Sequence, residues 1–240
     1  MPFPSPRPTP ARRLFVALDT ADLEHAVALA EALEGAVGGI KIGLELYSSR
    51  GAEGVRRLAE VGLPVFLDLK LHDIPNTVEG AAAAAAALDV QFLTVHALGG
   101  GAMIARAVSA CGAATVVLAV TILTSHDDAS LLALGFDGPA AAAVPRLAAI
   151  AREAGAGGVV CSPLEIAAAR AAHPRGVIVV PGIRPAGPRR PDDQARVATP
   201  SEALAAGADR LVIGRPITGA PDPAAAADAI AEEIADVARR

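Results

Sequence analysis

The chain of 240 residues contains no tryptophan, one tyrosine and only two cysteines, Cys111 and Cys161. Two cysteines cannot form the disulfide framework of a small secreted domain, and they cannot supply a tetrahedral thiolate zinc site. Both lie in apolar stretches of the sequence. We therefore expect buried free thiols in a reducing, cytoplasmic compartment.

A basic surplus and a long hydrophobic run are absent as well. The 21 basic and 26 acidic residues give a net charge of −5, whereas a general nucleic-acid binder carries a basic excess or a dense basic stripe. The apolar run at 81–88 is far shorter than the ~18 residues of a membrane span. We therefore expect neither a nucleic-acid partner nor a membrane partner. Apolar residues still make up 52% of the chain, which is ample for a core.

The N-terminal segment differs in composition from the rest of the chain. Proline occupies positions 2, 4, 6, 8 and 10, which opposes both helix formation and donation to a sheet. The segment has no apolar h-region, so it does not resemble a secretory signal. We expect residues 1–11 to form a loose tail and residues 12–240 to form one catalytic domain, because no internal linker is recognisable.

Short β-branched runs alternate with Ala/Leu/Glu-rich stretches in the remainder. Eight of these runs are mostly apolar without alternation, which is typical of parallel strands buried on both faces. They are 14–18, 39–42, 65–69, 92–95, 115–120, 158–161, 177–180 and 210–213.

Helix starts are recognisable between these runs. Asp22 is placed to cap a helix that runs through Ala32, Pro75 lies near the start of another, and Ser201 precedes a third. A short additional helix is expected around 130–134. Eight strands, each followed by a helix, predict a single-domain (β/α)8 TIM barrel. A doubly wound open sheet uses the same alternation, but no Gly-x-Gly-x-x-Gly turn follows the first strand.

Polar residues gather where the predicted strands end. In a barrel these C-terminal ends carry the functional site. Ionisable residues occur at four or more of these strand ends. This predicts that they converge in one charged site, rather than that the strands end in polar residues by chance. The residues concerned are Asp19, Lys41, Asp68, Lys70, His96, Thr121, Thr124, Ser125, Ser162, Gly182, Arg184, Gly214 and Arg215.

The loops after the last two predicted strands read PGIR (181–184) and IGRP (213–216). Loops at these places commonly form a phosphate site in (β/α)8 barrels. Glycine lets backbone N–H groups approach an anion, and Arg184 and Arg215 each offer a planar donor fork. A helix that starts near Pro216 would add its positive end. The pattern predicts phosphate binding. The alternative is that the glycine ends a strand and the arginine is a solvated loop residue, which gives the same sequence.

The densest charge cluster after a buried strand reads DLKLHD (68–73). Asp68 and Lys70 are two residues apart, so on an extended strand their side chains point the same way. The carboxylates of Asp68 and Asp73 would keep Lys70 protonated, which suits a proton donor rather than a Schiff-base nucleophile. A structural salt bridge at the barrel mouth accounts for these residues equally well.

The histidines give no metal-ligand pattern. No His-x-His or His-x-x-x-His pair occurs, and the acidic residues near His72 and His126 cluster with lysine, so we expect no metal site. His25 and His173 fall in helix or loop patterns and are expected at the surface. His96 ends a strand, where it would either pack at the barrel mouth or contact a ligand.

The twelve residues 66–77, FLDLKLHDIPNT, resemble the active-site signature of the orotidine 5′-phosphate decarboxylase family. This signature is highly specific. Shorter motifs agree with the family in order and spacing over nearly the whole chain, whereas the Pro-rich tail and residues 189–191 have no match. The shorter motifs are VALD (16–19), KIG (41–43), LTS (123–125), PGIR (181–184), DDQ (192–194) and IGRPIT (213–218).

The resemblance is strongest to the shorter bacterial form of the family, and it implies a metal-free decarboxylase that makes UMP from orotidine 5′-phosphate without a cofactor. Lys70 would protonate C6 of the pyrimidine after CO₂ leaves, within a network formed with Asp68 and Asp73. Asp19 and Lys41 would bind the ribose hydroxyls, and Lys41 would also belong to the charge network.

The resemblance also implies the remaining substrate contacts and a homodimer. Asp73, Ile74 and Thr77 would complete the site of the neighbouring subunit. Thr124 and Ser125 would contact the pyrimidine. The phosphate would be held by Arg184, Gln194, Gly214 and Arg215, with Gln194 on a loop that closes over it. Pro181 would also belong to the substrate-binding residues.

Two other functions fit parts of the sequence. Magnesium-dependent keto-sugar-phosphate decarboxylases and hexulose-phosphate synthases share the Asp-x-Lys-x-x-Asp pattern, but they generally place Glu where this chain has Lys41. They also lack the HDIPNT segment (72–77). A binding protein for phosphate ligands would keep Arg184 and Arg215 while losing Lys70 or Asp68, and this chain has both sets.

Overall fold

The computed structural model describes residues 9–185 and 197–239. In this part of the chain, eight parallel strands form a closed barrel in sequence order, and β8 pairs with β1. The barrel confirms the predicted single-domain (β/α)8 fold and excludes the open sheet. The strands are β1 (Leu14–Ala17), β2 (Gly39–Ile42), β3 (Val65–Leu71), β4 (Phe92–His96), β5 (Val116–Val120), β6 (Gly158–Val160), β7 (Val177–Val180) and β8 (Arg210–Ile213).

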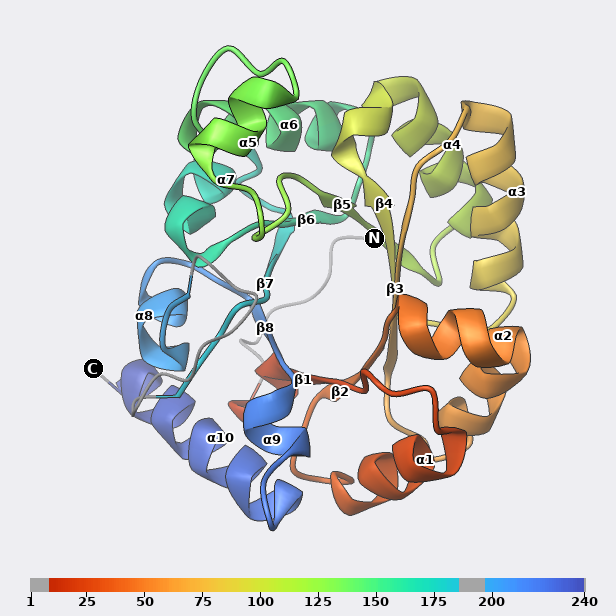
Figure 1. The fold of residues 1–240 in the computed structure, drawn as a ribbon, viewed down its shortest axis with the longest axis vertical. Coiled ribbons are helices and arrows are strands. Elements are labelled where there is room, and N and C mark those ends of the chain that lie inside the picture. The colour runs from red at the N-terminus through yellow and green to blue at the C-terminus, as the bar shows by residue number, and fades with distance from the viewer. Residues whose placement is uncertain (1–8, 186–196, 240) are drawn as a thin grey trace.

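Helices surround the barrel (Figure 1). Short 3₁₀ helices occur at Ala11–Arg13, Ala97–Gly99 and Pro163–Glu165. The α-helices of the described part are α1 (Leu23–Ala32), α2 (Leu44–Ala59), α3 (Pro75–Ala86), α4 (Gly100–Cys111), α5 (Asp128–Ala133), α6 (Ala140–Glu153), α7 (Ile166–Ala172), α8 (Pro200–Ala205), α9 (Arg215–Thr218) and α10 (Pro223–Arg239).

Three of the predicted strands, β2, β7 and β8, have the expected bounds, and the other five differ by one or two residues. Asp22 caps α1 as expected, since its carboxylate accepts a hydrogen bond from the His25 N–H at 3.2 Å. The expectation for Ser201 was wrong. Thr199 caps α8 instead, because it forms a reciprocal capping box with Glu202.

The described chain begins with a short turn before β1. Residues 1–8 lie outside the described part, but Ala11, which was assigned to the tail, begins the first 3₁₀ helix. Pro10 has a φ of −48°, and its carbonyl accepts a hydrogen bond from the Arg13 N–H at 3.1 Å. This turn leads directly into β1.

Phenylalanine rings fill the interior of the barrel. Phe15, Phe66 and Phe92 pack edge to face, with ring centroids 5.6–6.2 Å apart. Gly39 makes room for one of them, because a Cβ atom there would lie 2.4 Å from the Phe15 ring. Phe66 also lines the cavity at the mouth of the barrel. Phe66 therefore connects the aromatic layer to the cavity.

A second and larger core lies between the barrel and its helices. Cys111 and Cys161 are buried in it as free thiols, as expected. His25 is exposed, as expected, but the surface assignment of His173 was wrong. Its ring is buried because it packs against Gly176 and its Nε2 lies 3.0 Å from the Ala156 carbonyl. No helix in the described part is long and apolar enough to cross a bilayer.

Candidate active site

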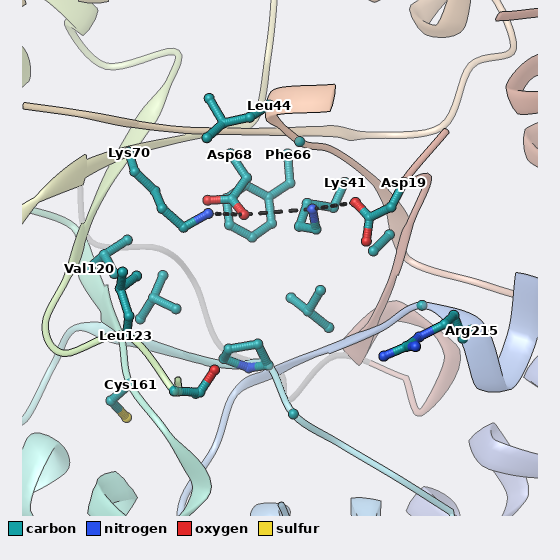
Figure 2. A pocket seen from close by; sticks show the side chains of 18 of the residues that line it. Asp19, Lys41, Leu44, Phe66, Asp68, Lys70, Val120, Leu123, Cys161 and Arg215 are labelled. Atoms are coloured by element: carbon teal, nitrogen blue, oxygen red, sulfur yellow. Dashed lines mark hydrogen bonds and ion pairs between the residues drawn. The ribbon is translucent and has the colours of Figure 1, made fainter. Parts of the chain in front are cut away.

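A cavity of about 360 Å³ opens at the carboxyl ends of the strands (Figure 2). It collects side chains that are far apart in the sequence but follow different strands of one barrel, as the fold requires. Ten of the predicted site residues line it, namely Asp19, Lys41, Asp68, Lys70, Thr124, Pro181, Gly182, Arg184, Gly214 and Arg215.

One wall of the cavity carries a row of alternating charges. The Lys70 ammonium lies 2.8 Å from Asp68 Oδ2, and the Lys41 ammonium lies 3.6 Å from the same oxygen. Lys41 also contacts Asp19 Oδ1 at 3.2 Å, which completes the row drawn in Figure 2. Each carboxylate therefore lies beside an ammonium group, and Asp68 lies between two of them.

Asp68 is held in its charged form. Burial alone would raise the pKa of its carboxyl group. The charges of Lys41 and Lys70, together with hydrogen bonds from Lys70 and Thr94, outweigh burial and bring the pKa below its usual value. The side chain of Asp68 is 13% exposed, so its negative charge acts where little water screens it.

Lys70 reaches Asp68 through a different backbone path from the one predicted. The expectation assumed a regular strand, but Lys70 has a φ of +50°, and the pairing between β3 and β4 shifts register between Leu67 and Leu71. A residue other than glycine adopts this left-handed backbone conformation only at a cost in free energy. The local irregularity, rather than the period of a strand, aims Lys70 at Asp68.

Two arginines also line the cavity. Arg184 follows β7, and its backbone N–H donates to the Ala198 carbonyl at 2.9 Å. Arg215 begins α9 directly after β8 and, in Figure 2, extends into the cavity. Together with Lys41 and Lys70, these arginines give the cavity four cationic side chains against two carboxylates. The excess suits an anionic ligand.

Some predicted site residues do not line the cavity. Asp73, Ile74 and Thr77 are exposed between β3 and the first turns of α3, and Ser125 is exposed as well. The Asp73 carboxylate accepts a hydrogen bond from the Ile74 N–H at 2.6 Å. Gln194 lies outside the described residues.

Sequence reasoning missed two groups of residues at the site. Thr94 on β4 is fully buried and hydrogen-bonds to both Asp68 and Lys70. The only signal was a single hydroxyl inside the apolar run FLTVH (92–96). Apolar lining residues were also missed, because such residues have the same pattern as ordinary core; they are Leu44, Val120, Ile122, Leu123, Val160 and Cys161.

His96 packs at the barrel mouth beside the charge row. Its ring stacks on His72 with centroids 5.4 Å apart, and its Nδ1 accepts a hydrogen bond from the Leu98 N–H at 3.4 Å. Burial, followed by the charges of His72, Lys70 and His126, lowers the pKa of His96 from 6.5 to about 4. The ring is therefore neutral near pH 7. Among the described residues, no group of three or more His, Cys, Asp or Glu side chains is placed to hold a metal ion.

The lowered pKa of His96 makes folding stability depend on pH. Between about pH 6.5 and pH 4 the unfolded chain binds a proton at this residue and the folded chain does not, so stability falls as the pH falls through this range. We expect His96→Gln to reduce the loss of melting temperature between pH 7 and pH 4.5, measured by thermal unfolding. His25→Gln, which removes an exposed imidazole from α1, serves as the control. If His96→Gln lost as much melting temperature as the wild type between pH 7 and pH 4.5, the lowered pKa of His96 would not be the cause.

The fold and the cavity together define a class: a (β/α)8-barrel enzyme with a carboxylate–lysine row facing two arginines. The family model described as "Orotidine 5'-phosphate decarboxylase / HUMPS family" matches residues 12–230. The chain belongs to this family.

Similar proteins agree with this assignment. The chain is 57% identical to an orotidine 5′-phosphate decarboxylase of Anaeromyxobacter sp. (strain K) over 223 residues, covering 92% of this chain and 98% of that protein. It is 55% identical to the one of Thermobifida fusca over 228 residues, covering 93% and 96%. The crystal structure of orotidine 5′-phosphate decarboxylase from Lactobacillus acidophilus matches with a TM-score of 0.80 and 39% identity, covering 93% and 99%.

Proposed function

We propose that this chain is an orotidine 5′-phosphate decarboxylase, which converts orotidine 5′-phosphate to UMP and CO₂ as the last step of de novo UMP synthesis. The observation that carries the proposal is that one cavity holds the row Asp19–Lys41–Asp68–Lys70 together with Arg184 and Arg215. It supplies cations for a phosphate and a proton donor for a carbanion. Relatives at 49–57% identity that bear this name support it.

The proposed substrate has features that match the two sides of the cavity. Its phosphate binds Arg184 and Arg215, with the backbone at Gly214 and Pro181 in close approach. The ribose hydroxyls bind Asp19 and Lys41, and the pyrimidine contacts Thr124 and Ser125. The role of Gln194 in covering the phosphate rests on the resemblance to the family alone.

The proposed reaction breaks the bond between C6 and the carboxyl carbon. The electron pair stays on C6 as CO₂ leaves, and Lys70 Nζ then transfers a proton to C6 to give UMP. The neutral amine then takes up one proton from solution, so that each turnover consumes one proton in addition to releasing CO₂. Asp68 beside the substrate carboxylate disfavours the ground state, while the fixed ammonium groups stabilise the negative charge that develops at C6.

We propose that this chemistry needs neither a metal nor an organic cofactor. The Lys41 ammonium contacts both Asp19 and Asp68, so a cation already lies between the carboxylates that would otherwise bind Mg²⁺. A magnesium site at this place would favour a further carboxylate instead of an ammonium group.

We propose further that the active unit is a cytoplasmic homodimer. Ile74 is 66% exposed on the segment that follows β3, and Asp73 and Thr77 lie on the same exposed segment. A large apolar side chain presented between two polar ones suits a contact with a second copy of the chain. These three residues would complete the site of the partner. The two buried free thiols support the reducing location.

The direct test is decarboxylation by purified protein that has been treated with EDTA. Orotidine 5′-phosphate is added, its loss is followed by ultraviolet absorbance, and the product is identified as UMP. Rapid conversion without metal supports both the reaction and the absence of a cofactor. If folded protein gives no conversion, sugar phosphates with Mg²⁺ test the magnesium-dependent relatives, and binding of UMP without turnover would indicate a binding protein.

Replacement of Arg215 by alanine should mainly weaken binding of the phosphate. A charge-assisted hydrogen bond of about 1.5–3 kcal/mol is lost, which corresponds to a rise in KM of about 10- to 100-fold. Arg56→Ala is the matched control, because Arg56 is an exposed arginine of α2 that pairs with Glu53 on the surface. An unchanged KM for Arg215→Ala in steady-state kinetics would contradict the phosphate assignment.

A further inference from the structure

Thr94 lies behind the cavity wall that carries Asp68 and Lys70, and it does not itself line the cavity. Its Oγ1 donates a hydrogen bond to Asp68 Oδ1 at 2.9 Å and accepts one from the Lys70 backbone N–H at 2.8 Å. The side chain is fully buried on β4. One hydroxyl group therefore joins the two residues that the proposed reaction uses most directly.

The geometry on both sides of this hydroxyl is under constraint. Lys70 has a left-handed backbone with a φ of +50°, and the β3–β4 ladder is interrupted at this place. Its N–H therefore has a side chain as its partner, where a regular ladder would offer a carbonyl. A strained conformation persists only when surrounding contacts enforce it, and Thr94 provides such a contact.

Asp68 is constrained in the same way. Its Oδ2 faces the ammonium groups of Lys70 and Lys41 at 2.8 and 3.6 Å, while its Oδ1 receives the Thr94 hydroxyl. The two oxygens thus have different partners on different sides, which fixes the rotation of the carboxylate. Without the hydroxyl, the carboxylate could turn and the Lys70 ammonium would follow it.

We propose that Thr94 is a positioning residue for catalysis: its hydroxyl holds the Lys70 backbone in the left-handed conformation and fixes the Asp68 carboxylate, so that the Lys70 ammonium is aimed at the reacting carbon. Thr94 itself touches no substrate atom. The inference rests on the proposed function for its kinetic consequence, whereas the geometric part concerns Asp68 and Lys70 alone.

Three variants test the proposal. Thr94→Val keeps the shape of the side chain and removes the hydroxyl, and Thr94→Ser keeps the hydroxyl. Thr115→Val is the matched control. Thr115 directly precedes β5, is 3% exposed, and donates a hydrogen bond to the Val90 carbonyl at 2.7 Å, away from the cavity. Circular dichroism and thermal unfolding establish that each variant is folded.

The kinetic result expected is a split between turnover and binding. A displacement of about 1 Å at a reacting group lowers the rate by about 10²-fold, so kcat of Thr94→Val should fall by about that factor. The Kd for UMP should change by less than about threefold, because the phosphate contacts are distant. Thr94→Ser should restore most of kcat, and Thr115→Val should retain it.

A second readout does not depend on the reaction. Asp68 loses one stabilising hydrogen bond in Thr94→Val, so its carboxyl group should titrate at higher pH than in the wild type. NMR of protein with ¹³C-labelled aspartate side chains measures this titration, and the Asp68 signal is identified by its absence in Asp68→Asn. The titration should be unchanged in Thr115→Val and nearly restored in Thr94→Ser.

The outcomes separate the two proposals. If the wild type does not decarboxylate orotidine 5′-phosphate, the proposed function fails, while the NMR titration still decides whether Thr94 fixes Asp68. A wild-type kcat in active Thr94→Val overturns the positioning role. An Asp68 titration that is unchanged in Thr94→Val also overturns it. An equal loss of kcat in Thr94→Val and Thr115→Val overturns it as well, because it would indicate a general effect of removing a buried hydroxyl.

Discussion

Replacement of Lys70 by alanine is expected to abolish decarboxylation while the variant still binds UMP. The Lys70 ammonium lies 2.8 Å from Asp68 Oδ2 on the cavity wall, and the proposed reaction needs it both to stabilise charge at C6 and to donate a proton. The proton transfer is worth about 10²- to 10⁴-fold, and the electrostatic stabilisation is worth about 10²- to 10³-fold. We expect kcat to fall by at least about 10⁴-fold.

Binding and turnover are measured separately in this variant. Arg215, one of the two arginines proposed to bind the phosphate, lies across the cavity from Lys70 (Figure 2). Titration calorimetry with UMP should therefore give a Kd within about tenfold of the wild-type value. Retained decarboxylation in Lys70→Ala would remove Lys70 from the mechanism.

Mixing the inactive variant with Asp73→Ala provides a control for folding and also tests the dimer. Asp73 is exposed and is proposed to serve the partner's site, so a mixed dimer would contain one site with both defects and one intact site. After equal amounts exchange subunits, about half of the dimers are mixed, and about one quarter of the wild-type activity should return. No recovery by two folded variants would indicate that Asp73 serves its own subunit or none.

The barrel could be predicted from the sequence because its signals are local and repeated. Eight apolar runs of strand length, separated by helix patterns, leave few arrangements of parallel strands. The closed order from β1 to β8 follows from that count.

The helix caps were less predictable. Ser201 and Thr199 are both good capping residues, and only the reciprocal bond with Glu202 decides between them.

The charge row was predictable in its members but not in its geometry. Asp68 and Lys70 were expected to meet because strand side chains repeat every two residues, yet they meet across a backbone irregularity at Lys70. A left-handed lysine has no signal in the sequence, since glycine is the residue usual at such a position. Its hydrogen-bond partner, Thr94, comes from the neighbouring strand, so the pairing depends on strand register and on no local motif.

His173 shows the same limit outside the site. It lies between α7 and β7, where sequence patterns indicate a surface loop, but its ring packs against Gly176 and bonds to the Ala156 carbonyl. Both the small neighbour and the distant carbonyl are needed to bury it. Side chains whose surroundings come from separate segments are those that local patterns place least well.

Replacement of Asp68 by asparagine is expected to reduce both turnover and stability. The variant keeps the size of the side chain but leaves the ammonium groups of Lys41 and Lys70 without the carboxylate that lies between them. We expect kcat to fall by about 10³-fold, as when a preorganised electrostatic contact is removed. The free energy of unfolding at pH 7 should fall by about 2 kcal/mol, the scale of a hydrogen bond to a charged group.

The stability difference should itself depend on pH, and this identifies its origin. Because the folded-state pKa of Asp68 is lowered, its contribution is present above the unfolded value of 3.8 and is lost as the pH falls through the folded value. Wild type and Asp68→Asn, compared by chemical unfolding at several pH values, should therefore differ less in acid than at pH 7. Asp137→Asn removes an exposed carboxylate and should follow the wild type. A difference that persists unchanged in acid would mean that the asparagine disturbs packing in the wall of the cavity, and that the charge of Asp68 is not what stabilises the fold.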